Sequence, residues 1–392
     1  MKHTPLFLAA ASIIAAGLVV AGPLTPPPGP LASSYKTLSE VEPRTAVNAV
    51  NTPGTASAIY QITQPGSYYL TGPVTGAPGK SGIVIASSGV TLDLNGFDVL
   101  GVEGSADGVR IGSPLAPLRN ITVRNGSIRG WGALGLDGAA PSASNCVYTD
   151  LTSQGNTNAG FFLGEGSVVS ACAATENGGP GFFAVEACTL SRCSARGNSQ
   201  AGFMLSTGCI AAECTAMNNT TSGFIGVSGG LTLSACSSLY NYQKGFYVAV
   251  TYPNPGATTC TACTASGNGA EGFYSSDGTL FSACNAGGNA LDGFSLGSNC
   301  TIRGCTAEYN SGAGASGIAL RSTGNRAEDN HLIGNRYGLS ALQPGNFIAR
   351  NTARDNITAP FSIAAGNSAA PVISSPGANA FATMTAWSNV AY

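Results

Sequence analysis

The chain has 392 residues, of which only 9% are charged, and its formal net charge at pH 7 is −2. So low a charge excludes binding to nucleic acid or to an anionic membrane by electrostatic attraction. With 43% hydrophobic residues, 54 glycines and only two histidines, the chain is neither disordered nor built around a histidine-rich metal centre.

The N-terminus has the pattern of a secretory signal peptide, which we expect over residues 1–21. Lys2 and His3 precede an apolar run, and Val19-Val20-Ala21 offers a small-residue cleavage site. An uncleaved membrane anchor is the alternative, but the run is shorter than the ~20 residues that a span needs. Residues 22–58 are then a proline-rich linker and N-terminal cap. The mature protein is predicted to be secreted, or to reside at the cell surface or in the periplasm, without a membrane segment.

A short motif repeats along most of the chain, and we expect the domain that it marks to span residues 59–360. A Gly-Phe dipeptide recurs at spacings of 21, 21, 21, 22, 27 and 21 residues. An asparagine lies five residues before each of these phenylalanines, and a cysteine (once a leucine) lies ten residues before. Extended both ways, with asparagine replacing cysteine at the ends, the pattern gives about twelve units. The phenylalanines are Phe161, Phe182, Phe203, Phe224, Phe246, Phe273 and Phe294.

The length and composition of the unit decide the fold class. It is too short for helical-pair repeats of about 33 to 47 residues. Its brief apolar alternation, broken by Gly, Asn and Ser, is typical of strands and turns. We therefore predict an all-β, single-stranded right-handed parallel β-helix, a solenoid of about twelve coils of ~21 residues, with residues 361–392 as a C-terminal cap or tail. Phenylalanine and cysteine should face inward, and asparagine should form an amide ladder at the turns.

The chain from about Tyr60 onward resembles the pectate-lyase-like superfamily of right-handed β-helix proteins. Gln64–Leu70, Gly89–Gly96 and the closing Trp387–Tyr392 resemble segments of secreted bacterial β-helix repeat proteins. The resemblance implies the fold but little about function, because one fold hosts many activities. The Gly-His-Gly and Arg-Ile-Lys strings that galacturonan hydrolases share, and the Asp-Pro-His string of uronate epimerases, are absent from the sequence.

Twelve cysteines in a chain with a signal pattern would usually imply disulfides. Seven of them, however, share one inward column of the repeat, where other units have Asn or Leu. A buried ladder of free thiols is the preferred interpretation, and some bridges between coils are the alternative. Cys260-x2-Cys263 would need a second ligand pair to hold zinc. We expect neither a metal nor a cofactor.

The outward position beside the phenylalanine column is apolar or aromatic over six units. Exposed patches of this kind usually mark a partner. Three partners are possible for this patch: a polysaccharide or cell-surface glycan that stacks on it, a second copy of the chain that packs against it, or the tail 361–392 that covers it. The row is Arg110, Gly135, Phe162, Phe183, Met204, Ile225, Tyr247, Tyr274 and Ser295. Within it Phe162, Phe183, Tyr247 and Tyr274, together with Trp131, are the candidate carbohydrate-binding or interface residues.

The N-terminal third holds the candidates for catalysis, Asp107, Arg110 and Arg129. Insertions at residues 112–118, 137–144 and 252–256 fall at one corner of the expected coil, and such loops can wall a groove. Ordinary ion pairs between coils are the alternative. We expect a secreted β-helix that binds or scaffolds carbohydrate or cell-surface material without an identifiable catalytic site. A polysaccharide lyase or glycoside hydrolase acting on coils one to three, and a structural or adhesion protein, are the alternatives.

Overall fold

The computed structural model describes residues 42–112, 117–138, 143–248, 257–374 and 384–392. The chain divides into two units, residues 1–43 and 44–392, and the fold described below is that of the second. The expected signal peptide lies outside the described residues. The described residues form strands and turns without a helix, and so they include none long and apolar enough to cross a membrane.

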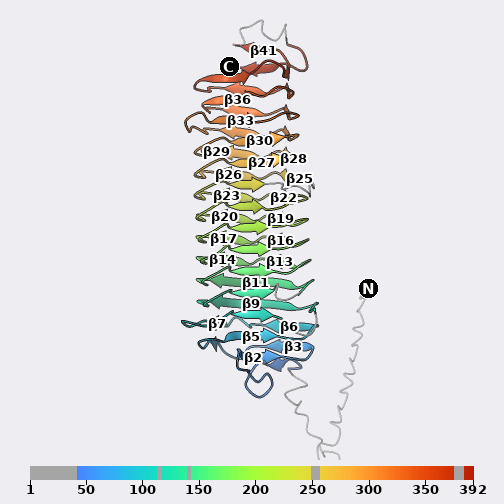
Figure 1. Cartoon of the computed structure of the whole chain (residues 1–392), viewed down its shortest axis with the longest axis vertical. Helices are drawn as coiled ribbons and strands as arrows, with labels where there is room; N and C mark the ends of the chain where they lie inside the picture. Colours follow the sequence, from blue (N-terminus) through green and yellow to red (C-terminus); the bar gives the residue numbers. More distant parts are fainter. Residues whose placement is uncertain (1–41, 113–116, 139–142, 249–256, 375–383) are drawn as a thin grey trace, which may run out of the picture. The chain divides into compact units, whose positions relative to one another are not determined.

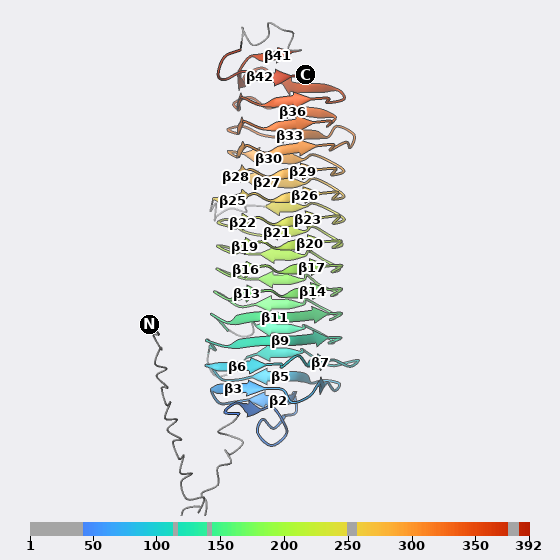
Figure 2. The ribbon, with the colours of Figure 1, turned by 180° about the vertical axis from the view of Figure 1, so that it is seen from behind.

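Parallel strands stack in rungs along this unit, from β2 near its N-terminal end to β41 (Val372–Ser374) near its C-terminal end (Figure 1). The same stacking is visible from behind in Figure 2. A coil from the middle shows the plan. It consists of β18 (Phe203–Leu205), β19 (Ile210–Ala212) and β20 (Thr215–Met217). Each strand pairs in parallel with the equivalent strand of the next coil: β18 with β21 (Phe224–Gly226), β19 with β22 (Thr232–Ser234), and β20 with β23 (Ser237–Leu239).

The coils form a 28-stranded sheet and a 14-stranded sheet, with one strand per coil in the smaller one. The predicted solenoid is therefore confirmed, and it has fourteen coils because two N-terminal coils precede the twelve marked by the repeat. The smaller sheet consists of β2 (Ala58–Ile62), β5 (Ser81–Ile85), β8 (Val109–Ile111), β10 (Leu136–Gly138), β12 (Phe161–Leu163), β15 (Phe182–Ala184), β18, β21 (Phe224–Gly226), β24 (Phe246–Val248), β27 (Phe273–Asp277), β30 (Phe294–Ser298), β33 (Ser316–Leu320), β36 (Tyr337–Ala341) and β39 (Ala359–Ile363).

The core of the middle coils is built from columns of identical side chains. Phe161, Phe182, Phe203, Phe224, Phe246, Phe273 and Phe294 are buried, with successive ring centroids 4.7–4.9 Å apart and ring planes within 6° of parallel. All twelve cysteines are buried free thiols, as the preferred interpretation expected. Many of them donate their S–H to a backbone carbonyl, as Cys214 does to Ala212 at 3.3 Å.

The expected amide ladder is present at the turn between the two sheets. Both the backbone N–H and the side-chain amide of Asn198 donate to Oδ1 of Asn219, at 3.1 and 3.0 Å, and Asn219 donates to Asn241 in the same way. The carboxamides are buried and fully bonded, so they replace water without leaving a polar group unsatisfied. Asn177 precedes them and Asn268 follows in the same ladder.

The described part of the tail closes the C-terminal end of the larger sheet. β40 (Ser368–Ala369) pairs with β37 (Phe347–Ala349), and β42 (Asn389–Ala391) pairs with β38 (Thr352–Arg354) and β41. At the other end β1 (Thr45–Ala46) pairs with β3 (Gly66–Tyr69). The described tail therefore does not cover the outward row of the smaller sheet.

Candidate functional site

The outward row of the smaller sheet is continuous from coil to coil. Side chains alternate along a strand, so the residue after each core phenylalanine faces away from the core. The strand register joins six of these residues in one line, and each is half-buried. We call this line the strip: Phe162, Phe183, Met204, Ile225, Tyr247 and Tyr274.

The ends of the row differ from expectation at one position. Asp137, not Gly135, lies between Arg110 and Phe162 in the register. Leu136 pairs with Phe161 and takes the inward position that phenylalanine holds elsewhere. At the other end Ser295 follows Tyr274, as expected, and is 3% exposed. The strip thus has a polar residue at each end.

Aromatic rings meet along the strip without packing tightly. The rings of Phe162 and Phe183 are 5.0 Å apart and inclined by 22°, and those of Tyr247 and Tyr274 are 5.3 Å apart and inclined by 52°. The ammonium group of Lys244 lies 5.2 and 5.3 Å from the two tyrosine ring centroids. It also pairs with Glu271 at 3.4 Å, so the cation beside the strip has a counter-ion.

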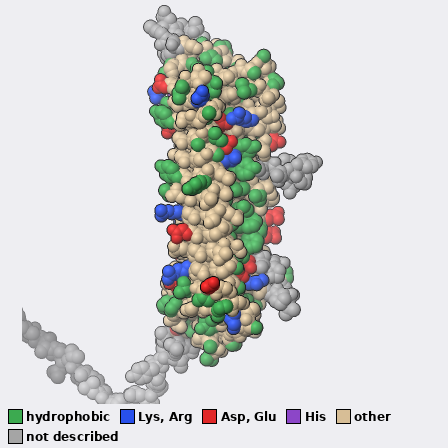
Figure 3. Space-filling model, turned by 60° about the vertical axis from the view of Figure 1, so that its left-hand side comes forward, with side chains coloured by type: hydrophobic (Ala, Val, Ile, Leu, Met, Phe, Trp, Pro, Cys, Tyr) green, Lys and Arg blue, Asp and Glu red, His purple; other side chains and the backbone are tan. Residues whose placement is uncertain are grey.

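A hollow of about 420 Å³ opens beside the middle of the strip. Met204, Ile225 and Tyr247 of the strip line one side. The turn that precedes each strand lines the other, through Gln200, Ala201, Thr221, Ser222, Gln243 and Lys244. On the face of the molecule seen in Figure 3, charged side chains are scattered singly or in mixed groups and form no broad patch of one sign.

A buried carboxyl group lies near the C-terminal end of the strip. Asp292 accepts a hydrogen bond from the backbone N–H of Ser316 at 2.8 Å and pairs with Arg321. Burial raises the pKa of Asp292, although both of these partners favour its charged form. With both oxygens engaged and the side chain 2% exposed, Asp292 positions the turn rather than a ligand.

The three candidate catalytic residues do not converge. Asp107 is 7% exposed, and its Oδ1 accepts the backbone N–H of Leu134 at 3.1 Å, so it holds a turn. The guanidinium of Arg110 lies 3.7 Å from the carboxylate of Asp137 in the next coil. Both charged side chains are therefore bound to neighbouring coils, which agrees with the alternative that these residues form ordinary contacts and ion pairs between coils.

Arg129 lies on the other sheet, in β9 (Thr122–Arg129), and pairs with Asp98 in β7 (Asp98–Leu100). The insertions expected to wall a groove are largely outside the described residues, at 113–116, 139–142 and 249–256. The described strands before them, β8, β10 and β24, all belong to the smaller sheet, so the insertions do follow equivalent strands.

Trp131 is a core residue, which corrects its prediction as a surface contact. Its side chain is 1% exposed, and its indole N–H donates to the carbonyl of Val99 at 2.9 Å. The ring fills space left by glycines of neighbouring coils, because a Cβ built on Gly76 or Gly82 would lie only 2.9 or 2.8 Å from it.

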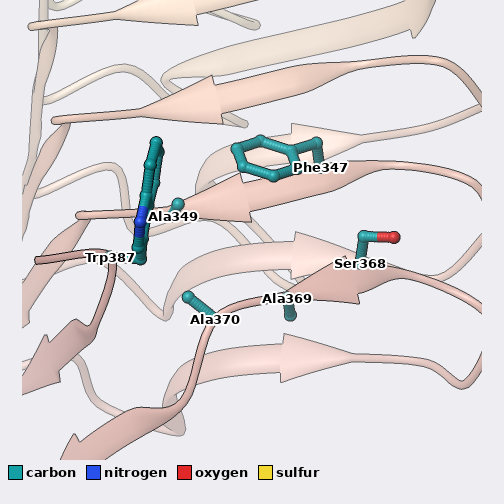
Figure 4. Close-up of a pocket in the computed structure, with 6 residues that line it drawn as sticks. All are labelled: Phe347, Ala349, Ser368, Ala369, Ala370 and Trp387. Atoms are coloured by element: carbon teal, nitrogen blue, oxygen red, sulfur yellow. The ribbon is translucent and has the colours of Figure 1, made fainter. Parts of the chain in front are cut away.

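The structure also contains a second hollow, of about 340 Å³, that the sequence did not single out (Figure 4). Phe347 and Trp387 form two of its walls, with ring centroids 6.5 Å apart and planes nearly perpendicular. The guanidinium groups of Arg326 and Arg350 lie over the rings of Phe347 and Trp387, at 4.6 and 4.8 Å. This hollow lies on the larger sheet, away from the strip.

Among the described residues, no group of three or more His, Cys, Asp or Glu side chains is arranged to hold a metal ion. Cys260 and Cys263, the pair considered for zinc, therefore belong to no such group among these residues.

Comparison with known proteins identifies the fold. The family model described as "Right handed beta helix region" matches residues 142–280 and 213–357, which together exceed half of the chain. No curated protein matches the sequence.

Two solved structures illustrate the likeness. The A-module of the mannuronan C-5 epimerase AlgE4 of Azotobacter vinelandii is 16% identical, with a TM-score of 0.58 over 72% of this chain and 90% of that chain. The tailspike receptor binding domain of the siphovirus 9NA is 10% identical, with a TM-score of 0.45 over 86% of this chain and 73% of that chain. At 16% identity the likeness to the epimerase module extends to the fold alone.

Proposed function

Because the chain belongs to the family of right-handed β-helix proteins, we propose that it uses one face of its solenoid to bind or scaffold carbohydrate. The fold is shared with the A-module of a mannuronan epimerase. Fold alone does not choose among such functions, so the proposal depends on the surface of this chain.

The observation that supports it is the strip. Six apolar or aromatic side chains in line, half-buried and without a cover from the described tail, leave water in contact with a continuous apolar surface. A ligand with flat apolar faces would remove that surface from water, and the C–H faces of sugar rings pack on aromatic rings. A chain of such rings would suit a line of side chains that repeats every ~4.8 Å.

The charges support binding by packing rather than by attraction. Lys244 is compensated by Glu271, and Arg110 by Asp137. The alternative of a lyase or hydrolase finds no support in Asp107, Arg110 and Arg129, because each is engaged in another contact and Arg129 lies on the other sheet. In keeping with the signal pattern at residues 1–21, we place the binding outside the cytoplasm.

The test compares two pairs of tyrosines on columns of immobilised polysaccharides. Tyr247→Ala with Tyr274→Ala should reduce retention by about tenfold or more, the loss of roughly 1.4 kcal/mol of packing. Tyr240 and Tyr242 are exposed and lie off the strip, so replacing both by alanine should leave retention unchanged.

Two results would overturn the proposal. One is a wild-type protein that no polysaccharide in the panel retains. The other is an equal loss in both pairs of variants. If the wild type is instead oligomeric in solution and only the Tyr247/Tyr274 variant loses mass, the strip is an interface between copies of the chain.

A further inference from the structure

We infer that the hollow beside the strip is a subsite for an uncharged sugar ring, so that the polysaccharide recognised is neutral rather than acidic. This rests on the proposed function of the strip and adds the class of ligand.

The floor of the subsite is apolar and regular. Met204, Ile225 and Tyr247 are successive residues of the strip, and they pair in register across three coils. Two coil steps cover roughly 10 Å, so a flat chemical group can contact all three side chains along the axis of the stack. The C–H face of a sugar ring fits a floor of this kind, because it can pack there without losing a hydrogen bond.

The opposite wall is polar. Gln200, Thr221 and Gln243 occupy the same place on three successive coils, joined by their backbones through the bonds from Thr221 N–H to Gln200 and from Gln243 N–H to Thr221. Both glutamine side chains are exposed, and within the described part of the chain neither carboxamide has a hydrogen-bond partner. Each therefore offers two donors and an acceptor to the hydroxyl groups at the edge of a sugar ring.

Thr221 gives a second sign of a missing partner. Its hydroxyl is buried and makes no hydrogen bond within the described residues, although the side chain lines the hollow. Buried hydroxyl groups are usually paired, and an unpaired one points to a partner that is absent. The hydroxyl is closed to water in this structure, so it would have to turn toward the hollow to meet a hydroxyl of the ligand, which is a partner of the right chemistry.

The charges beside the hollow favour a neutral ligand. Lys244 is the one cation among the lining residues, and it pairs with Glu271 at 3.4 Å while its ammonium group lies over the two tyrosine rings. An acidic sugar would bring a carboxylate toward Glu271 and would have to take Lys244 from it. Asp292, the next acidic residue along these turns, is itself bound to Arg321.

The test uses the full chain and columns of neutral polysaccharides (a glucan and a galactomannan) and acidic ones (alginate and polygalacturonate). Retention of the wild type by a neutral polysaccharide is expected, with little change between low and high salt. Gln200→Ala with Gln243→Ala should weaken it about tenfold, the equivalent of one or two hydrogen bonds. Thr221→Val, which keeps the shape and removes the hydroxyl, should weaken it a few-fold. Gln343→Ala, at an exposed glutamine of another coil, is the matched control.

The outcomes separate the subsite from the strip. A wild type retained only by acidic polysaccharides, or a double glutamine variant that binds as tightly as the wild type, overturns this inference and leaves the proposed function standing. A wild type that no column retains overturns both. Gln200 and Gln243 are exposed, whereas the hydroxyl of Thr221 is buried, so the unfolding midpoint of each variant is measured as well. An unchanged midpoint shows that the substitution acts through binding.

Discussion

Aromatic rings that face into the solenoid pack differently from those that face outward from the same strands. The inward phenylalanines stack within 6° of parallel and are fully buried, whereas the outward ring pairs Phe162–Phe183 and Tyr247–Tyr274 are inclined by 22° and 52° and are half-buried. The backbone spacing is the same for both sets. The difference therefore comes from the surroundings: close packing permits one ring orientation inside, while outside the rings lack neighbours on one side.

In a repeat protein of this kind, the outward columns are the surfaces that are available for binding. The side chains of the inward columns are buried against one another. They therefore stabilise the stack but have no exposed surface with which to contact a ligand. Outward columns keep apolar area in contact with water, and that area is what a partner can remove.

The largest expected contrast is in thiol reactivity. All twelve cysteines are inside, and burial raises the pKa of groups such as the Cys172 thiol. Exposing them requires opening a stack whose unfolding costs at least ~5 kcal/mol, so a thiol reagent should react about 10³-fold or more slowly with the native protein than with the denatured one. Denaturation without reductant should release twelve reactive thiols per chain. Release of almost none would reveal disulfides, and rapid reaction of the native protein would show an open interior.

Substitutions at two adjacent residues of β18 test the comparison directly. Phe203→Ala should lower the free energy of unfolding by about 3–5 kcal/mol, because it leaves a cavity in a close-packed column. Met204→Ser, one residue along and half-buried, should cost far less. Denaturant unfolding of the two variants measures both. Equal large losses would mean that the strip is itself buried, by a partner or by another part of the chain.

The asparagines give a polar version of the same test. Asn219→Ala removes a buried carboxamide that joins Asn198, Ala195 and Asn241, and it should cost about 2–4 kcal/mol because those partners lose their bonds. Asn218→Ala changes the exposed neighbour, whose φ of 54° alanine adopts with a small penalty, and it should cost about 1 kcal/mol. A larger loss at Asn218 than at Asn219 would contradict a ladder that stabilises the coils.

The smallest effect is expected on the outer surface. Arg350 lowers the pKa of Asp329 by donating hydrogen bonds to it at 2.7 and 2.8 Å, so this pair stabilises the fold at pH values above the ordinary pKa of an aspartate, about 4. The contribution is lost as pH falls through the lower folded value. Half of the Asp329 side chain is exposed, so water and salt screen the pair. Asp329→Asn should change stability only slightly at neutral pH, and urea unfolding should show that difference vanishing in acid. A difference that grows in acid would contradict the pairing.

Much of the fold is readable from the sequence because each position of the repeat has one task. The Gly-Phe dipeptide marks the inward ring, and the cysteines and asparagines mark the bend and the turn, so twelve coils can be counted. The two first coils are missed because Ile83 and Ile85 of β5 serve as core without any of those residues. Aliphatic side chains fill the same volume and leave no distinctive pattern.

The strip was predictable, and the N-terminal candidates were not. Alternation along a strand places the residue after each core phenylalanine outside, whatever its type. Trp131 fails the same reasoning because the space it fills is left by Gly76 and Gly82, far away in the sequence. The partners of Asp107 and Arg110 depend likewise on how one coil lies on the next. The lining of the hollow by Gln200, Thr221 and Gln243 could have been found from their common place, three residues before each phenylalanine.

The amide ladder gives the stack a direction. In every step from Asn156 to Asn335 the N–H groups of one coil donate to the carboxamide oxygen of the next coil toward the C-terminus. Aligned amide dipoles add, as they do along an α-helix, so the column is polarised. At its start the oxygen of Asn156 accepts the backbone N–H of Trp131, while its far end presents donors. The two ends are thus chemically unlike, and further coils, or another stack, could continue the column only head to tail, which gives the solenoid a polarity of growth like that of a filament.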